Sequence, residues 1–92
     1  MSKHATPEDL EAAMLALLKE RGPGKTIGPA DVAQALGGNQ PEGWGPLMKP
    51  VRKVAVRLMK EGRIVILRKG RPVDPDDFSG TYRLALSPIQ DP

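Results

Sequence analysis

The feature that most constrains the fold of this chain is a change of period at Gly62. Before it, Leu47 to Lys60 carries apolar residues every three or four positions, which is typical of a helix with one buried face. After it, Arg63 to Arg68 is dominated by β-branched residues, which favour a strand. Glycine often ends a helix because it adopts the left-handed backbone conformation at little cost. We therefore predict a helix that closes after Glu61 and is followed at once by a strand.

Two prolines set the start of this helix. Pro46 stands at its head, and Pro50 lies one turn further on. A proline in a helix interior removes a hydrogen bond, but in the first turn few amides have an intrahelical partner. We therefore predict that the regular helix begins near Met48 or is kinked on entry. Its buried face comprises Leu47, Val51, Val54 and Leu58.

Two further helices are predicted upstream from their capping signals. In each, a proline at the first helical position is followed by acidic residues, which suit the positive end of a helix. The first spans Pro7 to Arg21 and the second Pro29 to Leu36. Lys25 to Ile27 is expected to form a short strand between them, and Gly37 to Gly45 a loop.

A second long strand is predicted at Thr81 to Leu86, where alternate residues are apolar. We expect it to pair with Arg63 to Arg68 as an antiparallel hairpin. The connection, Lys69 to Gly80, is rich in glycine, proline and aspartate and is too long for a tight turn. It is therefore expected to project as an ordered loop or wing.

The predicted order is helix, short strand, helix, helix, strand, wing and strand, which is that of a winged helix-turn-helix domain. Three helices with a small antiparallel sheet make an α+β arrangement. A chain of 92 residues has room for one small core. We expect residues 6–87 to form this single domain, with residues 1–5 and 88–92 as flexible tails.

The stretch from Lys49 to Arg71 is strongly basic. It holds nine of the 14 lysines and arginines of the chain and a single acid, Glu61. A basic helix followed by a basic hairpin is the surface that a winged-helix domain presents to duplex DNA. The predicted DNA-binding residues are Lys49, Arg52, Lys53, Val56, Arg57, Lys60, Arg68, Lys69 and Arg71.

Within this set, Arg52, Lys53 and Val56 are predicted to approach base edges, and the other bases of the helix to contact phosphates. Lys69 to Pro72 resembles the glycine-arginine-proline core of minor-groove hooks. The alternative interpretation is a solvated basic face and a proline-stiffened turn. In that case Arg68 or Arg71 pairs with one of the nearby acids, Asp74, Asp76 or Asp77.

The three aromatic residues are too few to form a stacking platform for single strands. Trp44 is expected to act as a hydrophobic staple or core cap at the head of the third helix. Phe78 and Tyr82 are expected to anchor the core or the wing.

Composition also bears on the other function classes. The chain has no cysteine and one histidine, His4, which argues against thiol and metal chemistry. The acids at positions 74, 76 and 77 have no histidine or activated serine beside them, so we expect no enzyme activity or cofactor, and no small-molecule ligand is evident from the sequence. Magnesium binding by these acids finds no support in their spacing. No apolar run is long enough to span a bilayer and no signal peptide is present, so a cytoplasmic protein is expected.

The chain resembles the DUF3253 family, small bacterial domains of unknown function. The longest matching segment is Lys69 to Pro75, and the matches extend from Leu10 to Leu86. The other matching segments are Arg21 to Ile27, Val32 and Ala33, Trp44, Leu47 and Met48, and Glu61 to Ile64. The resemblance implies a winged-helix fold and a DNA-binding role, and it supplies no assigned activity.

A second hypothesis is an interaction module. The same fold would then bind a protein or a second copy of the chain, with the bases serving solubility or an acidic partner. The net charge of +3 is modest for a DNA-binding protein, and six acids flank the basic run. Duplex DNA is the partner predicted first, and a protein or homodimer partner is the alternative.

Overall fold

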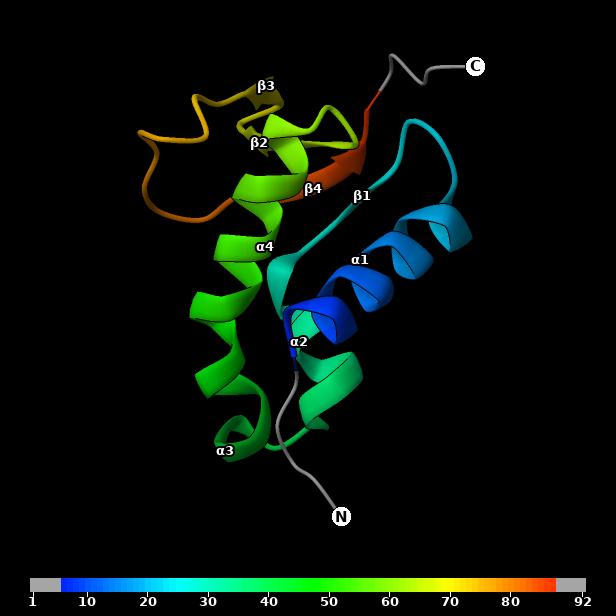
Figure 1. Ribbon diagram of the computed structural model, residues 1–92, viewed down its shortest axis with the longest axis vertical. Helices are drawn as coiled ribbons and strands as arrows, with labels where there is room; N and C mark the ends of the chain where they lie inside the picture. The colour runs from blue at the N-terminus through cyan, green and yellow to red at the C-terminus, as the bar shows by residue number, and fades with distance from the viewer. Residues whose placement is uncertain (1–5, 88–92) are drawn as a thin grey trace.

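A helical layer and a small sheet make up the part of the chain, residues 6–87, that a computed structural model describes. The helical elements are α1 (Pro7–Arg21), α2 (Pro29–Gly37), α3 (Pro41–Trp44), the 3₁₀ turn η1 (Gly45–Leu47) and α4 (Met48–Lys60). The strands are β1 (Thr26–Ile27), β2 (Ile64–Arg68), β3 (Arg71–Pro72) and β4 (Arg83–Leu86). They form one antiparallel sheet in the order β1-β4-β2-β3. Strands β2, β3 and β4 lie at one end of the molecule, α4 runs away from that end, and α1 lies beside β1 (Figure 1). The predicted α+β, winged-helix-like arrangement is confirmed.

Helices α1 and α2 start where the sequence predicts because their first amides find acceptors. The Thr6 hydroxyl accepts from the Asp9 amide at 3.1 Å, and the Asp9 carboxylate accepts from the Thr6 amide at 3.2 Å. In α2 the Asp31 carboxylate accepts from the Gly28 amide at 2.9 Å. Helix α4 begins at Met48, as predicted, so that Pro50 falls in its first turn.

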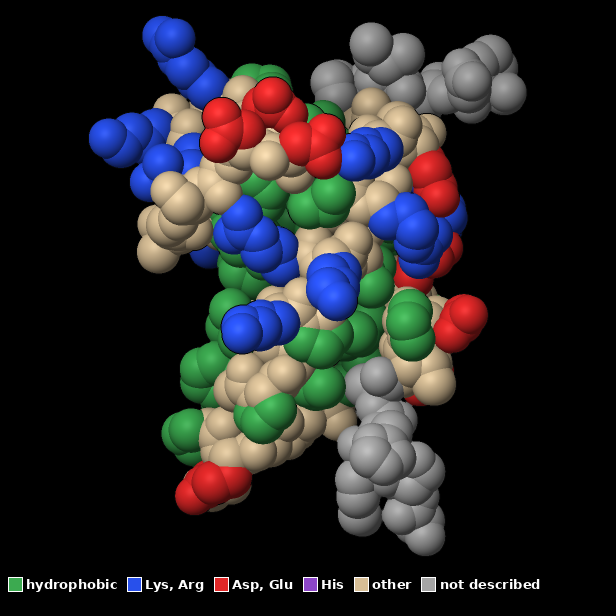
Figure 2. Space-filling model, turned by 60° about the vertical axis from the view of Figure 1, so that its left-hand side comes forward, with side chains coloured by type: hydrophobic (Ala, Val, Ile, Leu, Met, Phe, Trp, Pro, Cys, Tyr) green, Lys and Arg blue, Asp and Glu red, His purple; other side chains and the backbone are tan. Residues whose placement is uncertain are grey.

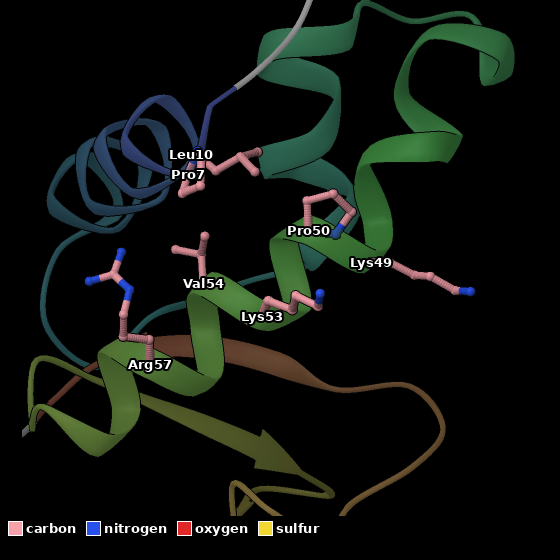
Figure 3. A pocket seen from close by; sticks show the side chains of 7 residues that line it. All are labelled: Pro7, Leu10, Lys49, Pro50, Lys53, Val54 and Arg57. Carbon is pink, nitrogen blue, oxygen red and sulfur yellow. The ribbon is translucent and has the colours of Figure 1, made fainter.

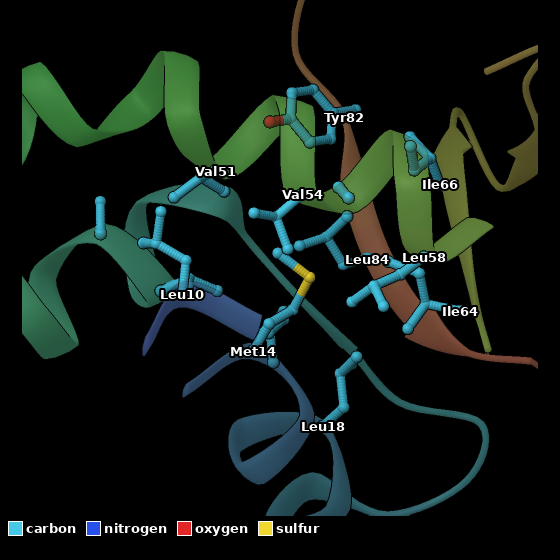
Figure 4. Close-up of a cluster of buried hydrophobic side chains, with 14 residues drawn as sticks. Leu10, Met14, Leu18, Val51, Val54, Leu58, Ile64, Ile66, Tyr82 and Leu84 are labelled. Atoms are coloured by element: carbon cyan, nitrogen blue, oxygen red, sulfur yellow. The ribbon is translucent and has the colours of Figure 1, made fainter. Parts of the chain in front are cut away.

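The core lies between α1, α4 and the inner face of the sheet (Figure 4). The predicted seam of α4 is confirmed, with Val51, Val54 and Leu58 buried and Leu47 partly buried against them. From the sheet, Ile64 pairs with Leu86 and Ile66 with Leu84, so alternate residues of β2 and β4 face the helices. The remaining fully buried large side chains are Leu10, Met14 and Leu18 of α1, Ile27 of β1 and Val32 of α2. Burial of this apolar surface supplies most of the stability of such a domain.

The prediction of a loop from Gly37 to Gly45 is wrong, because α3 and η1 occupy most of this segment. Pro41 starts α3 at the first helical position, where its missing amide costs nothing. The end of α2 approaches the backbone of α3 closely. A Cβ on Gly37 would lie 2.4 Å from the Gly43 carbonyl oxygen. This contact brings Trp44, partly buried against the core, to the head of α4, as predicted.

The wing also differs from the prediction. Lys69 to Gly80 was expected to be one long loop, but its first residues form a tight hairpin in which Arg71 pairs with Arg68 and Pro72 with Leu67. Lys69 and Gly70 form its turn with φ values of 53° and 79°, the left-handed conformation that two-residue hairpin turns require. Asparagine or glycine usually fills the Lys69 position, so the turn was not recognisable from sequence.

The second long strand is also shorter than predicted, because β4 begins at Arg83 rather than Thr81. The predicted tails, residues 1–5 and 88–92, lie outside the described residues. No helix within residues 6–87 has the length and apolar character to cross a bilayer.

Candidate nucleic-acid interface

The outward face of α4 carries a row of bases on regularly spaced turns. Lys49, Lys53, Arg57 and Lys60 are exposed there, opposite the buried seam. Figure 2 shows lysine and arginine side chains distributed over this side of the molecule, with one cluster of carboxylates at the top and others at the right edge and the lower left. Lys49, Arg52, Lys53 and Val56 line a shallow depression of about 430 Å³. The structure thus brings together the three residues predicted to approach base edges and one of those predicted to contact phosphates.

Arg52 binds the wing loop, residues 73–82, which connects β3 to β4. Its guanidinium lies over the Phe78 ring, 3.8 Å from the centroid, and donates a hydrogen bond to the Phe78 carbonyl. The Phe78 ring in turn meets Tyr82 edge-on, with centroids 5.4 Å apart and planes at 79°. Tyr82 is buried, and desolvation raises the pKa of its phenol. The expected anchoring role of both aromatic residues is confirmed, and the Arg52 stack was not foreseen.

A second contact joins the loop to α4. The Lys60 ammonium pairs with the Asp76 carboxylate at 2.7 Å, and both side chains are exposed. The Asp76 amide donates to the Asp74 carboxylate at 2.9 Å, which closes a local turn around these acids. The alternative interpretation of the wing expected an ion pair with Arg68 or Arg71. The structure instead pairs Asp76 with Lys60.

Arg57 belongs to a four-membered ion network between α1, α4 and the turn that precedes β2. Its guanidinium pairs with Glu11 at 2.7 Å and with Glu61 at 3.2 Å, and Arg63 pairs with Glu11 at 2.7 Å. Hydrogen bonds from Arg57 and then Arg63 lower the pKa of Glu11 below its ordinary value of 4.5. The stabilisation from this network is therefore present above pH 4.5 and is lost as the pH falls through the lowered pKa of Glu11.

Arg68 holds the base of the wing. Its Nε donates to the Thr81 carbonyl at 2.9 Å, and its guanidinium packs against Gly80. The φ of 82° at Gly80 favours glycine, and a Cβ there would lie 2.9 Å from an Arg68 nitrogen, so the end of the Arg68 side chain would have to shift. Arg68 therefore closes the loop at the end where β4 begins.

Four of the nine predicted DNA-binding residues keep a free cationic group. Within residues 6–87, Lys49, Lys53, Lys69 and Arg71 make no ion pair or side-chain hydrogen bond. Two lie in the first half of α4 and two at the turn between β2 and β3. The ninth residue, Val56, is partly buried against the core. The free bases thus occupy the two elements that a winged-helix-like domain presents to a duplex.

Replacing Arg52 with alanine is expected to release the wing loop from α4 and to destabilise the fold by about 1 to 2 kcal/mol. Amide hydrogen exchange at residues 74–80 should become faster. Arg52→Lys should behave similarly, because an ammonium keeps the charge but not the planar stack. Lys53→Ala, one residue away, is the matched control. Equal loop protection in all three variants would show that Arg52 does not hold the wing.

Sequence reasoning missed Phe78 and Glu11 as partners of the basic run, and it considered Asp76 as a partner of Arg68 or Arg71 rather than of Lys60. A local signal existed only for Glu61, which lies one helical turn after Arg57. Among the described residues, no three acidic or histidine side chains lie close enough together to hold a metal ion.

Fold and surface together define a small winged-helix-like α+β domain with free bases on its third long helix and its hairpin. The chain belongs to the DUF3253 family, described as a protein of unknown function, whose profile matches residues 7–87. No curated protein is similar to it.

Proposed function

We propose that this protein binds duplex DNA, with the first half of α4 in the major groove and the β2–β3 turn against the neighbouring backbone or minor groove. The observation that carries the proposal is the position of the four free bases. Lys49 and Lys53 lie one helical turn apart on α4, and Lys69 and Arg71 flank Gly70 at the tip of the hairpin. The role proposed is binding without catalysis or a cofactor.

The contacts around the wing support this proposal. A loop that swung freely would lose conformational entropy on binding, whereas a loop already attached to the helix does not. The Arg52–Phe78 stack and the Lys60–Asp76 pair connect the wing loop to α4 at two points. We therefore propose that Arg52 positions the wing. The four unpaired lysine and arginine side chains would contact the DNA backbone and the edges of the nucleobases.

The dependence of affinity on salt tests the proposal. Each phosphate neutralised contributes a slope of about −0.9 to log affinity against log salt concentration, so four free bases predict a slope of roughly −3.6. Binding of a random duplex would be followed by fluorescence anisotropy between 50 and 200 mM salt. Over this range, proteins with larger interfaces lose about 10³-fold to 10⁵-fold in affinity for DNA. A slope near −4.5 would mean that Arg57 or Lys60 exchanges its carboxylate for a phosphate, and a slope near −5.4 that both do, at about −0.9 per contact. A flat response would refute DNA binding through this face.

An interaction module is the second candidate, and the paired bases favour it. Arg57, Lys60 and Arg63 are all neutralised by acids of the same chain, which reduces the field available for DNA. Light scattering and a pull-down from nuclease-treated extract separate the two candidates. A partner that survives nuclease, together with a flat salt response, would favour the module. A monomer without such partners counts against it.

A further inference from the structure

A groove between the start of α1 and the side of α4 has the composition of a small-molecule site. Pro7 of α1 and Pro50 of α4 face each other across the gap (Figure 3), and the buried core residues Leu10 and Val54 line its inner part. Its volume is about 560 Å³. Ligand sites are typically clefts of roughly 300 to 1,000 Å³ with mostly apolar walls and a few polar groups that fix the orientation of the ligand.

The charged residues along this groove are all cationic. Lys49 and Lys53 extend from the α4 side, and Arg57 stands at one end, beside Val54, with its guanidinium directed towards α1 (Figure 3). Glu11 and Glu61 already neutralise Arg57, so the two lysines carry the uncompensated charge. A neutral apolar ligand would leave this charge unused, and an inorganic anion would leave the apolar walls exposed.

We infer that this groove binds small organic anions, with the apolar body of the ligand between Pro7 and Pro50 and its carboxylate against Lys53 or Lys49. The stems of the lysines continue the apolar wall, while their ammonium groups reach the solvent-facing end of the ligand. Charge-assisted hydrogen bonds from an ammonium to a carboxylate are among the stronger polar contacts in proteins. The inference does not depend on DNA binding.

The two lysines also belong to the proposed DNA-binding surface, which couples the two sites. An anion in the groove would occupy cations that otherwise neutralise phosphates, so the anion and DNA would compete. By linkage, each ligand then weakens the affinity for the other by the same factor. An organic anion would in this way release the protein from DNA.

The test uses the full chain labelled with ¹⁵N and the probe 2-naphthoate, with neutral 2-naphthylmethanol of similar shape for comparison. We expect naphthoate to shift the amide signals of Leu10, Lys53, Val54 and Arg57 with saturation, and the alcohol to bind about tenfold more weakly. Shifts that avoid these residues would overturn the inference. Equal binding of the alcohol would overturn its anionic part.

Substitutions test whether Lys49 and Lys53 bind the carboxylate of the ligand. The double variant Lys49→Gln with Lys53→Gln should bind naphthoate about tenfold more weakly, and unchanged affinity would refute the role of the lysines. Pro7→Glu should weaken it as well, because a glutamate at the first helical position suits the helix and places a carboxylate on the opposite wall. Lys19→Gln is the control, since Lys19 lies roughly 18 Å from Pro7 along α1.

Naphthoate binding without DNA binding would refute only the proposed function. DNA binding without naphthoate binding would refute only this inference.

Discussion

Replacing Gly37 with alanine is expected to destabilise the protein by about 2 kcal/mol and to lower its melting temperature by roughly 10 °C. The added methyl group would lie 2.4 Å from the Gly43 carbonyl oxygen and 2.8 Å from the Trp44 Cα, which are backbone atoms of α3. A backbone cannot rotate away as a side chain can, so α3 has to move off α2. Gly43→Ala should act similarly, because its Cβ would meet the Gly37 carbonyl oxygen at 2.0 Å.

Gly45→Ala is the matched control for this prediction. Gly45 has helical backbone angles, and a Cβ there would meet no atom within 4 Å. Alanine is a better helix former than glycine by about 1 kcal/mol, so this change should be neutral or stabilising. Thermal and urea unfolding of the three variants would give the comparison. If Gly37→Ala were as stable as Gly45→Ala, the prediction that α2 and α3 pack too closely for a side chain at position 37 would be contradicted.

The double variant Lys53→Gln with Lys69→Gln is expected to lower the affinity for duplex DNA about thirtyfold at 0.15 M salt. Each phosphate contact contributes roughly a factor of five at this concentration, because affinity scales with the salt concentration to a power of about −0.9 per contact. The salt slope should fall in magnitude from roughly 3.6 to about 1.8. Both side chains are exposed, so the fold should be preserved.

The control for this prediction removes the same charge elsewhere. Lys19 and Lys25 are exposed and have no ion-pair partner within residues 6–87. Lys19 lies at the far end of α1, and Lys25 precedes β1, at the edge of the sheet opposite β3. The double variant at these positions should lose little affinity. Equal losses in the two double variants would mean that only net charge matters and that α4 and the hairpin form no particular surface.

Most of the fold could be predicted from sequence because its signals are local. Pro7 and Pro29 mark the starts of α1 and α2, and Gly62 with its φ of 80° marks the end of α4. The segment from Gly37 to Gly45 was misassigned because its structure depends on contact between two glycines that leave no periodic pattern. The β2–β3 turn was missed because Lys69 adopts a conformation that lysine rarely takes.

The candidate site was predicted less completely than the fold. Helical periodicity places Lys49 and Lys53 on the exposed face of α4, and the structure agrees. It cannot show that Arg52 stacks on Phe78, 26 residues away, or that Lys60 meets Asp76. Such pairs depend on how the wing loop folds back over the helix. A basic residue that looks free in sequence is therefore often already bound within the chain.

The two attachments of the wing to α4 respond differently to salt. The Lys60–Asp76 pair is exposed, so dissolved ions screen it, whereas the Arg52–Phe78 stack is partly buried and is screened much less. The spacing between the helix and the hairpin should therefore persist at concentrations that abolish exposed ion pairs. A fall in DNA affinity with added salt would then report the loss of phosphate contacts from an interface whose shape stays the same.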